Sequence, residues 1–452
     1  GIFVVSSLYG DNGAIFIFGA VTFVGGGGGL PGVISPANSL VGSSPGDEEE
    51  SQIWLLGNGN YVVSSPRWNN GDIRDAGAVT WGNGTTGISG LISPANSLVG
   101  SSPDDRVGSV TVLSNGNYVV RNIWWDNGDI DAVGAVTWGN GATGISGLIS
   151  PANSLVGSSP EDLVGSGGVM ALSNGNYVVN GPRGDTGDSI GAGGAPGGRG
   201  AGGPWGFISP ANSLVGSRPG DGVGYTGVIT LSNGNYVVSS PSWANGDIDA
   251  VGAATWGNGA TGIRGLISPA NSLVGSKPLD LIGSDSVTAL SNGNYVVISP
   301  QWDNGDIEQA GAVTWGNGAT GISGLSSPAN SLVGSSPEDL VGRNNNDEEG
   351  RGVTALSNGN YVVNSSWWDN GALSDAGAIT LGDGNVGTPV GQLGPDNSIV
   401  GTNTLTKPGF DYDGVNQQLV IGRPLANMVT LLRFSSGEST LPPLYLPLVT
   451  RN

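Results

Sequence analysis

The sequence predicts an all-β chain folded as a β-propeller of about eight four-stranded blades. Two observations lead to this fold class. First, one unit recurs along the 452 residues, and its tyrosines lie 57 to 66 residues apart at Tyr61, Tyr118, Tyr177, Tyr236, Tyr295 and Tyr361. Second, many of the 84 Gly residues lie in turns between runs of Val, Ile, Thr, Tyr and Trp. A fixed period above about 50 residues indicates one supersecondary module per unit.

Each unit contains four strand candidates, which residues 100–157 show best. They are Ser109–Leu113, Asn117–Val120, Ala135–Trp138 and Asn153–Val156. The pair Asn115-Gly116 lies between the first two candidates and predicts a tight antiparallel hairpin, because both residue types tolerate positive φ. Sequential antiparallel strands form a meander, and one four-stranded meander is a propeller blade.

We expect a single repeat domain of eight units. Their approximate ranges are 1–42, 43–100, 101–157, 158–216, 217–275, 276–334, 335–401 and 402–452. The first unit lacks its first strand, and Leu444–Val449 stands where the last unit needs its fourth. In the fourth unit, the Gly-rich stretch Ser189–Gly203 replaces the usual third strand. Because Gly1 to Val5 resemble the middle of a repeat, we expect the chain to be part of a longer protein.

The alternative fold is a right-handed β-solenoid with three sides of about 20 residues per unit. Strands of a solenoid stack in parallel, whereas the Asn-Gly turn predicts an antiparallel hairpin in each unit. The propeller is therefore the favoured architecture.

The composition restricts the classes of function. The net charge is −21, with 36 acidic residues against 15 Lys and Arg, so we expect neither nucleic acid nor anionic membranes as partners. No run of about 18 apolar residues occurs, and no membrane insertion is expected. The chain has no Cys and no His, which excludes thiolate and His metal ligands and His-dependent catalysis.

Tryptophans precede an acidic loop in five units and are the first candidate site. They are Trp68, Trp124, Trp243, Trp302 and Trp367. If exposed, these rings would form aromatic platforms for carbohydrate. The alternative is that they pack between adjacent blades, since aromatic side chains supply the largest buried area.

The acidic loops themselves are the second candidate site. They present Asp126, Asp129 and Asp131 in one unit, and Asp303, Asp306 and Glu308 in another. Several hard oxygen ligands in a short loop are what Ca²⁺ prefers. The alternative is a turn in which Asp and Asn bond their own backbone and carry solubilising charge. We therefore expect no obligatory cofactor, with calcium as the one candidate.

The repeat unit resembles two known groups of repeats. Residues Asp280 to Trp315 resemble the FG-GAP blades of integrin alpha-type propellers, although Ser-Asn-Gly-Asn replaces the Asp-rich calcium loop of that family. The strings Asn-Gly-Asn-Tyr-Val-Val, Trp-Asp-Asn-Gly, Gly-Ala-Val-Thr-Trp-Gly-Asn-Gly and Asn-Ser-Leu-Val-Gly are similar to tandem repeats of large secreted bacterial proteins with filamentous-haemagglutinin-like domains. The second resemblance covers nearly the whole chain and implies an extracellular or cell-surface location.

These observations favour a non-enzymatic structural or adhesive repeat module of a secreted bacterial surface protein. The open edge of the first blade offers a route to self-assembly by strand addition. The first alternative is a lectin-like binder of surface glycans that uses the loop tryptophans and calcium. The second is a glycoside hydrolase that uses paired carboxylates, although the acidic residues are spread over equivalent loops rather than gathered in one cluster.

Overall fold

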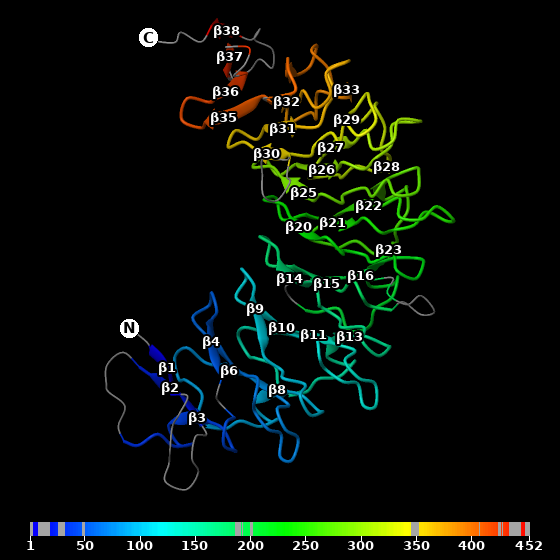
Figure 1. The fold of residues 1–452 in the computed structure, drawn as a ribbon. Helices are drawn as coiled ribbons and strands as arrows, with labels where there is room; N and C mark the ends of the chain where they lie inside the picture. The colour runs from blue at the N-terminus through cyan, green and yellow to red at the C-terminus, as the bar shows by residue number, and fades with distance from the viewer. Residues whose placement is uncertain are drawn as a thin grey trace. The chain divides into compact units, whose positions relative to one another are not determined.

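The computed structural model describes residues 3–7, 19–25, 32–47, 50–185, 191, 193–198, 202–344, 352–405, 407–423, 426, 428–433 and 444–447. All of its named elements are β-strands (Figure 1). Among these residues, there is no helix long and apolar enough to span a membrane. The contacts within the chain divide it into two larger units, each of which contains several repeats. The first unit is Gly1–Gly224 with Gly259–Leu266, and the second unit is Tyr225–Asn258 with Ile267–Asn452.

Repeats two, three and five to eight each fold as a four-stranded antiparallel meander. In the third repeat the strands are β9 (Ser109–Val112), β10 (Tyr118–Asn122), β11 (Ala135–Gly139) and β13 (Ser154–Val156). Their register pairs Tyr118 with both Val112 and Gly139, and Ala135 with Val156. Figure 1 shows these strands side by side in chain order. The prediction of an all-β fold built from propeller-type blades is confirmed.

The first unit contains the meanders of repeats one to four. Their other strands are β1 (Phe3–Ser7), β2 (Ala20–Val24), β3 (Ser39–Val41), β4 (Gln52–Leu55), β5 (Tyr61–Ser65), β6 (Ala78–Gly82), β8 (Ser97–Val99), β14 (Gly168–Ala171), β15 (Tyr177–Asn180), β16 (Gly194–Ala195), β17 (Gly197–Gly198) and β19 (Leu214–Val215). In the described part of the first repeat, β1 is an edge strand with no strand before it, as the sequence predicts.

The second unit contains the meanders of repeats five to eight. Their strands are β20 (Gly227–Thr230), β21 (Tyr236–Ser240), β22 (Ala253–Gly257), β24 (Ser272–Val274), β25 (Val287–Ala289), β26 (Tyr295–Ser299), β27 (Ala312–Gly316), β29 (Ser331–Val333), β30 (Val353–Ala355), β31 (Tyr361–Ser365), β32 (Ala378–Gly382), β34 (Ile399–Val400), β35 (Gly409–Asp413), β36 (Gln418–Arg423), β37 (Met428–Arg433) and β38 (Leu444–Pro447). The C-terminal strand β38 pairs with β37 as the expected fourth strand, and residues 448 and 449 of that prediction lie outside the described residues.

A two-residue strand from each following repeat extends the sheet before it. These donor strands are β7 (Gly90–Leu91), β12 (Gly147–Leu148), β18 (Gly206–Phe207), β23 (Gly265–Leu266), β28 (Gly324–Leu325) and β33 (Gly391–Gln392). Each runs parallel to the fourth strand of the preceding meander, as β12 does to β8. The sequence did not predict this pairing of a donor strand with the preceding repeat. The solenoid alternative is wrong for the strands within a repeat, which pair antiparallel.

The hairpin turn differs from the expected one in a single respect. The N–H of Gly116 donates to the carbonyl of Leu113 at 3.0 Å, and the N–H of Asn117 donates to Oδ1 of Asn115 at 3.0 Å. Of these two residues, only Gly116 has positive φ, at 85°, although both residue types tolerate it. The Asn side chain therefore stabilises the turn through its carbonyl oxygen, and the glycine alone takes the left-handed conformation.

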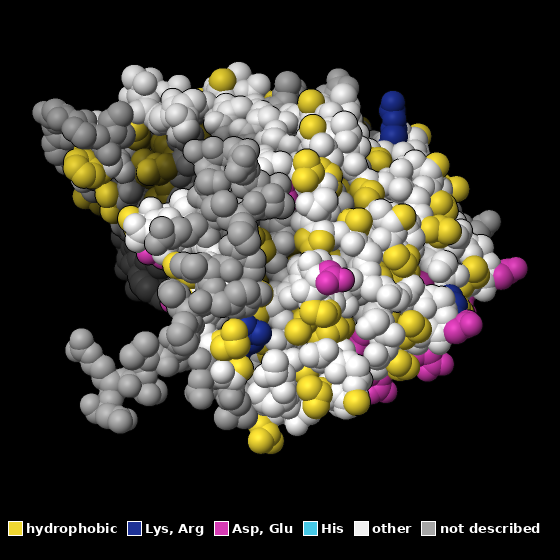
Figure 2. Space-filling view, turned by 90° about the horizontal axis from the view of Figure 1, so that it is seen from above, with side chains coloured by type: hydrophobic (Ala, Val, Ile, Leu, Met, Phe, Trp, Pro, Cys, Tyr) yellow, Lys and Arg dark blue, Asp and Glu magenta, His cyan; other side chains and the backbone are white. Residues whose placement is uncertain are grey.

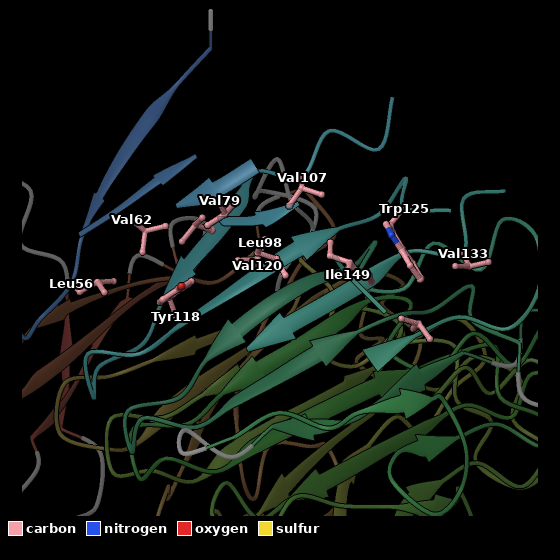
Figure 3. Packing of buried hydrophobic residues seen from close by; sticks show 13 residues of the cluster. Leu56, Val62, Val79, Leu98, Val107, Tyr118, Val120, Trp125, Val133 and Ile149 are labelled. Carbon is pink, nitrogen blue, oxygen red and sulfur yellow. The ribbon is translucent and has the colours of Figure 1, made fainter. Parts of the chain in front are cut away.

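The core lies between consecutive sheets. One cluster joins Val62, Val79 and Leu98 of the second repeat to Tyr118 and Val120 of the third (Figure 3). Successive apolar residues of a strand point to opposite faces, so each sheet buries both faces against its neighbours. This explains why the strands read as continuous Tyr-Val-Val and Ala-Val-Thr runs rather than as alternating patterns.

A tyrosine ring packs against a glycine in every regular repeat. A Cβ on Gly139 would lie 2.2 Å from Cζ of Tyr118, and one on Gly198 would lie 2.1 Å from Cζ of Tyr177. The second pair belongs to the fourth repeat, where the Gly-rich stretch forms β16 and β17 in place of a normal third strand. The fourth repeat therefore keeps the Tyr–Gly contact, while its strands fall into two sheets, β14-β15-β17 and β16-β19-β23.

We predict that Gly316→Ala strongly destabilises the chain, because the new Cβ would lie 2.1 Å from Cζ of the buried Tyr295. The expected loss is about 2–3 kcal/mol, as for other overpacked core sites. The control is Gly394→Ala, where no heavy atom lies within 4 Å of the added Cβ. Urea denaturation measures both variants, and equal midpoints would contradict the tight packing of the Tyr295 ring.

Candidate functional site

The acidic loop that follows β10 is a tight turn closed by its own first carboxylate. The N–H of Asn127 donates to the carbonyl of Ile130 at 3.0 Å, and the N–H of Ala132 donates to Oδ1 of Asp126 at 2.7 Å. The loop after β26 is built alike, with Oδ1 of Asp303 accepting from the N–H of Gln309 at 2.8 Å. In each loop the first acidic residue thus stabilises local backbone.

The six predicted calcium ligands do not converge. Asp126 and Asp303 close their loops, while the side chains of Asp129, Asp131, Asp306 and Glu308 are exposed. Nζ of Lys277 lies 3.9 Å from a carboxylate oxygen of Asp306. Among the residues that the structure describes, no group of three or more acidic side chains is arranged to hold a metal ion. This geometry is that of the capped turn rather than that of a cation site.

Three of the five predicted carbohydrate-binding tryptophans are buried. Trp68, Trp243 and Trp302 are only 2–3% exposed, so they present no ring face to a sugar in solvent. In the two Trp-Trp pairs, the equivalent buried rings belong to Trp125 and Trp368. The sequence contained the signal for this assignment, because the buried tryptophan directly precedes an Asp-Asn-Gly, Asn-Asn-Gly or Ala-Asn-Gly string.

The remaining two predicted tryptophans occupy different surroundings. Trp124 is 55% exposed and presents its ring at the surface. Trp367 is half-buried, and Nζ of Lys407 lies 4.9 Å from its ring centroid in a cation–π contact. The five residues therefore form no series of equivalent platforms, and Trp124 alone keeps the exposed ring that a sugar would need.

The tryptophans that end the third strand bind the next repeat. Nε1 of Trp81 donates to the carbonyl of Gly141 at 2.9 Å, and the same oxygen accepts from Nδ2 of Asn58 and of Asn60 at 2.8 Å each. The arrangement recurs at the carbonyls of Gly318 and Gly384, each of which accepts from two Asn side chains and one Trp. One carbonyl with three donors thus links consecutive repeats.

A second link is a buried aspartate in each of the first six connections between repeats. Sequence reasoning missed this series, which follows Ser-Pro, Arg-Pro or Lys-Pro at a fixed distance. The residues are Asp47, Asp105, Asp162, Asp221, Asp280 and Asp339, each at most 1% exposed. The signal for them was the recurrence of Asp two residues after that Pro, which was hidden by the variable residue between.

Backbone N–H groups on both sides of the connection bind the buried carboxylate. Oδ2 of Asp105 accepts from the N–H groups of Ser101 and Ser102, both at 2.8 Å. Oδ1 of the same residue accepts from the N–H of Asp126 at 3.0 Å, directly after the buried Trp125. The carboxylate thereby fixes the connection to the loop of the following repeat. Hydrogen bonds to a charged acceptor are the stronger kind.

The same contacts recur in both units. In the second unit, Oδ1 of Asp280 accepts from the N–H of Asp303 at 3.0 Å, and Oδ1 of Asp339 accepts from the N–H of Asp369 at 2.9 Å. In the first unit, Oδ1 of Asp162 accepts from the N–H of Asp185 at 2.8 Å. In each of these contacts, the buried carboxylate accepts from a backbone N–H of the loop.

The connections hold backbone strain that these hydrogen bonds offset. Asp104 and Arg106, on either side of Asp105, have φ of 64° and 51°, and Glu161 and Leu163 beside Asp162 have φ of 64° and 46°. Left-handed conformations of such residues cost about 1–2 kcal/mol each. A connection without the carboxylate would therefore relax away from this path.

Burial raises the pKa of these carboxyl groups although backbone donors oppose it. The pKa of Asp105 is raised to about 6, chiefly by burial, and the neighbouring charge of Asp126 adds to the rise. For the same principal reason, the pKa values of Asp47, Asp162, Asp280 and Asp339 are raised. The folded chain therefore binds protons on these groups more tightly than the unfolded chain does.

The comparisons with known proteins identify the repeat. The family model described as "Repeat of unknown function (DUF5650)" matches residues 1–51, 55–109, 112–166, 171–225, 230–284, 289–343 and 355–409. No curated protein gives a significant match to the chain. These findings do not bear on the resemblance to FG-GAP or haemagglutinin-like repeats, which stays a prediction.

Solved structures similar to the chain are distant. Virginiamycin B lyase from Staphylococcus aureus is 10% identical, with a TM-score of 0.30 and coverage of 82% of this chain and 90% of that one. A putative 6-phosphogluconolactonase from Bacteroides uniformis is also 10% identical, with a TM-score of 0.29 and coverage of 82% and 94%. Similarity at this level says nothing about activity.

We predict that Asp105→Asn lowers the free energy of unfolding by about 2–4 kcal/mol, because an amide NH₂ would face a backbone N–H that is left without an acceptor. The control is Asp104→Asn, whose side chain is exposed in an ion pair with Arg74 and whose φ of 64° suits Asn. Guanidinium denaturation measures both. Equal effects of the two substitutions would show that the buried carboxylate does not hold the connection.

We also predict that the chain is more stable at about pH 5 than at about pH 7.5, with a gain of up to about 1.4 kcal/mol per pH unit for each group that takes up a proton. The sign follows from the raised pKa values, because the added stability is fully present below the ordinary pKa of an unfolded Asp and is lost as the pH rises through the raised pKa of the folded chain, which is about 6 for Asp105. Denaturation midpoints across this range measure the slope, and Asp105→Asn should flatten it. A midpoint that rises with pH would contradict the prediction.

Proposed function

We propose, from the premise that the chain belongs to the family of the repeat of unknown function DUF5650, that it is a non-catalytic structural and adhesive module of a secreted or surface-exposed bacterial protein. One observation carries the proposal. The side chains that recur from repeat to repeat serve contacts that hold the repeats together. A chain selected for catalysis would instead keep one unique cluster of reactive groups.

The use of the recurring polar residues supports this role. Asp105 binds backbone of the connection and of the third repeat, Asn60 and Trp81 donate to the following repeat, and Thr137 Oγ1 lies 2.6 Å from Ser154 Oγ between adjacent strands of one repeat. In a repeat array, stability is a sum of such neighbour contacts. The array can therefore be lengthened without loss, which suits a spacer or scaffold.

The adhesive part of the proposal rests on exposed apolar side chains at one position of the repeat. Leu91, Leu148, Phe207 and Leu266 of the first unit end their donor strands and are 47–52% exposed. Figure 2 shows apolar side chains in separate small groups on one face, with few charged groups among them. Repeated weak contacts from such side chains give avidity to a surface. The extracellular location follows from the resemblance to secreted bacterial repeats.

A second candidate function is carbohydrate binding at Trp124, which the 55% exposure of its ring favours. Asp126 closes the loop beside it, so bound calcium is not needed to order this site. Trp124→Ala should abolish retention on immobilised polysaccharide if this function is correct. The matched control is Trp205→Ala, since Trp205 is 58% exposed outside these loops.

The adhesion test replaces Leu91, Leu148 and Leu266 together by Ser and measures retention of protein-coated beads on an apolar surface under flow. We expect a loss of about tenfold or more, because burying half of each leucine contributes about 1 kcal/mol. The control replaces the exposed Thr86, Thr143 and Thr261 of the same loops by Ser. Unchanged retention of the leucine variant, with the fold intact, would contradict the adhesive role.

A further inference from the structure

Repeats two, three, five and six each carry the pair Asn-Gly at three places. In the third repeat these are Asn115-Gly116 in the hairpin turn, Asn127-Gly128 in the acidic loop and Asn140-Gly141 in the turn after β11. The side-chain amide of Asn can react with the backbone nitrogen of the next residue, and glycine hinders this reaction least because it has no Cβ. The three pairs share this chemistry and differ in how the fold holds them.

The pair in the hairpin turn is held by hydrogen bonds on both reacting groups. Oδ1 of Asn115 accepts from the N–H of Asn117 at 3.0 Å, and Nδ2 donates to the carbonyl of Gly175 at 3.1 Å. The N–H of Gly116 donates to the carbonyl of Leu113 at 3.0 Å. Neither the amide nor the attacking nitrogen can turn toward the other unless these bonds break.

The pair in the turn after β11 is held in the same way. Oδ1 of Asn140 accepts from the N–H groups of Ala142 and Thr143 at 2.8 and 3.2 Å. The N–H of Gly141 donates to Oδ1 of Asn117 at 2.8 Å. A Cβ on Gly141 would overlap a backbone oxygen of the hairpin turn, so this turn has no room for a ring to form.

The pair in the acidic loop is open. Asn127 and Ile130 exchange backbone hydrogen bonds at 3.0 and 3.3 Å across a two-residue turn. Within the described part of the chain, neither the side chain of Asn127 nor the N–H of Gly128 has a hydrogen bond. Gly128 is exposed, and no heavy atom lies within 4 Å of the place of a Cβ. The amide and the nitrogen are therefore able to approach each other.

Two equivalent loops of the second unit hold their Asn more firmly. Nδ2 of Asn370 donates to the carbonyl of Gly401 at 2.9 Å. Nδ2 of Asn304 donates to the carbonyl of Gly334 at 3.1 Å. Breaking such a bond lowers the population of the reactive rotamer by up to about tenfold. These contacts distinguish Asn127 from its counterparts.

We propose that Asn127 is a site of spontaneous deamidation in the folded chain. Hydroxide removes the proton from the backbone nitrogen of Gly128, which attacks Cγ of Asn127. The N–Cγ bond forms, the Cγ–Nδ2 bond breaks, and the leaving group takes a proton from water and departs as ammonia. Water then opens the cyclic imide at Cγ to give Asp, or at the backbone carbonyl carbon to give isoaspartate. The sum is one water consumed and one ammonia released, with no redox change.

The product changes the loop without releasing its ends. Oδ1 of Asp126 accepts from the N–H of Ala132 at 2.7 Å and closes the loop outside the reacting pair. Either product adds one negative charge three residues after the exposed Trp124. Isoaspartate also lengthens the backbone between Asn127 and Gly128. The surface beside Trp124 therefore changes with the age of the protein while the repeat stays folded. This inference does not depend on the adhesive role.

Site-resolved mass spectrometry of the full chain tests the proposal. The folded chain is incubated for weeks in mildly alkaline buffer, and tandem spectra of its peptides give the converted fraction at Asn115, Asn127 and Asn140. We expect Asn127 to convert at least about tenfold faster than the other two, because only its reacting groups are able to approach each other. Equal rates at the three sites would overturn the proposal.

The same chain unfolded in urea is the control. All three pairs are then Asn-Gly in an unstructured chain, so we expect similar rates at the three sites. If Asn127 were just as strongly favoured in urea, the neighbouring sequence would select the site, and the structural argument would be overturned.

Two variants test the chemistry and its consequence. Asn127→Gln lengthens the side chain and requires a larger ring, so residue 127 should stay unmodified over the same incubation. Asn127→Asp reproduces the charge of the product, and its urea midpoint should equal that of the wild type because Asp126 still closes the loop. Conversion of the Gln variant at the wild-type rate would overturn attack by Gly128. A clearly lower midpoint of the Asp variant would contradict a product that stays folded.

Discussion

The fold depends on buried carboxylates that accept hydrogen bonds from backbone N–H groups. Asp105 and its counterparts satisfy their charge with backbone N–H groups from the connection and from the following repeat. A buried charge is tolerated only when hydrogen bonds replace its lost hydration. The aspartate therefore determines the path of the connection and the start of the next meander. This path requires positive φ at the residues on either side of the aspartate.

The carboxylates fix the position of each meander, and the apolar side chains of consecutive sheets then pack against each other. Consecutive sheets pack through Tyr, Val and Leu side chains, and the Tyr ring leaves room only for glycine opposite it. Three donors on the carbonyl of Gly141 join the hairpin turns at the other end of the repeat. Polar links at both ends with an apolar centre give each repeat one way to stack on its neighbour. This fixed stacking is what a scaffold needs.

The sequence predicted the meander because its signals are local. Asn115-Gly116 between two apolar runs specifies a hairpin whatever surrounds it. The donor strand escaped prediction because two residues carry no periodicity, and its pairing is with another repeat. The buried aspartates were not predicted, because a charged residue in a connection is usually exposed to water. Only the fold shows that backbone N–H groups bind these carboxylates in place of water. Adjacent Trp residues hid which ring of the pair is equivalent to the buried Trp68, Trp243 and Trp302: it is that of Trp125, whereas Trp124 is exposed.

Amide hydrogen exchange measured by NMR tests the central claim most directly. The N–H groups of Asp126, Asp185 and Asp303 lie in loops but donate to buried carboxylates. If the carboxylates hold the repeats together, these three amides exchange as slowly as those of central strand residues such as Val119. Exchange at the rate of exposed loop amides would show that the carboxylates do not bind the following repeat, and the account would fail.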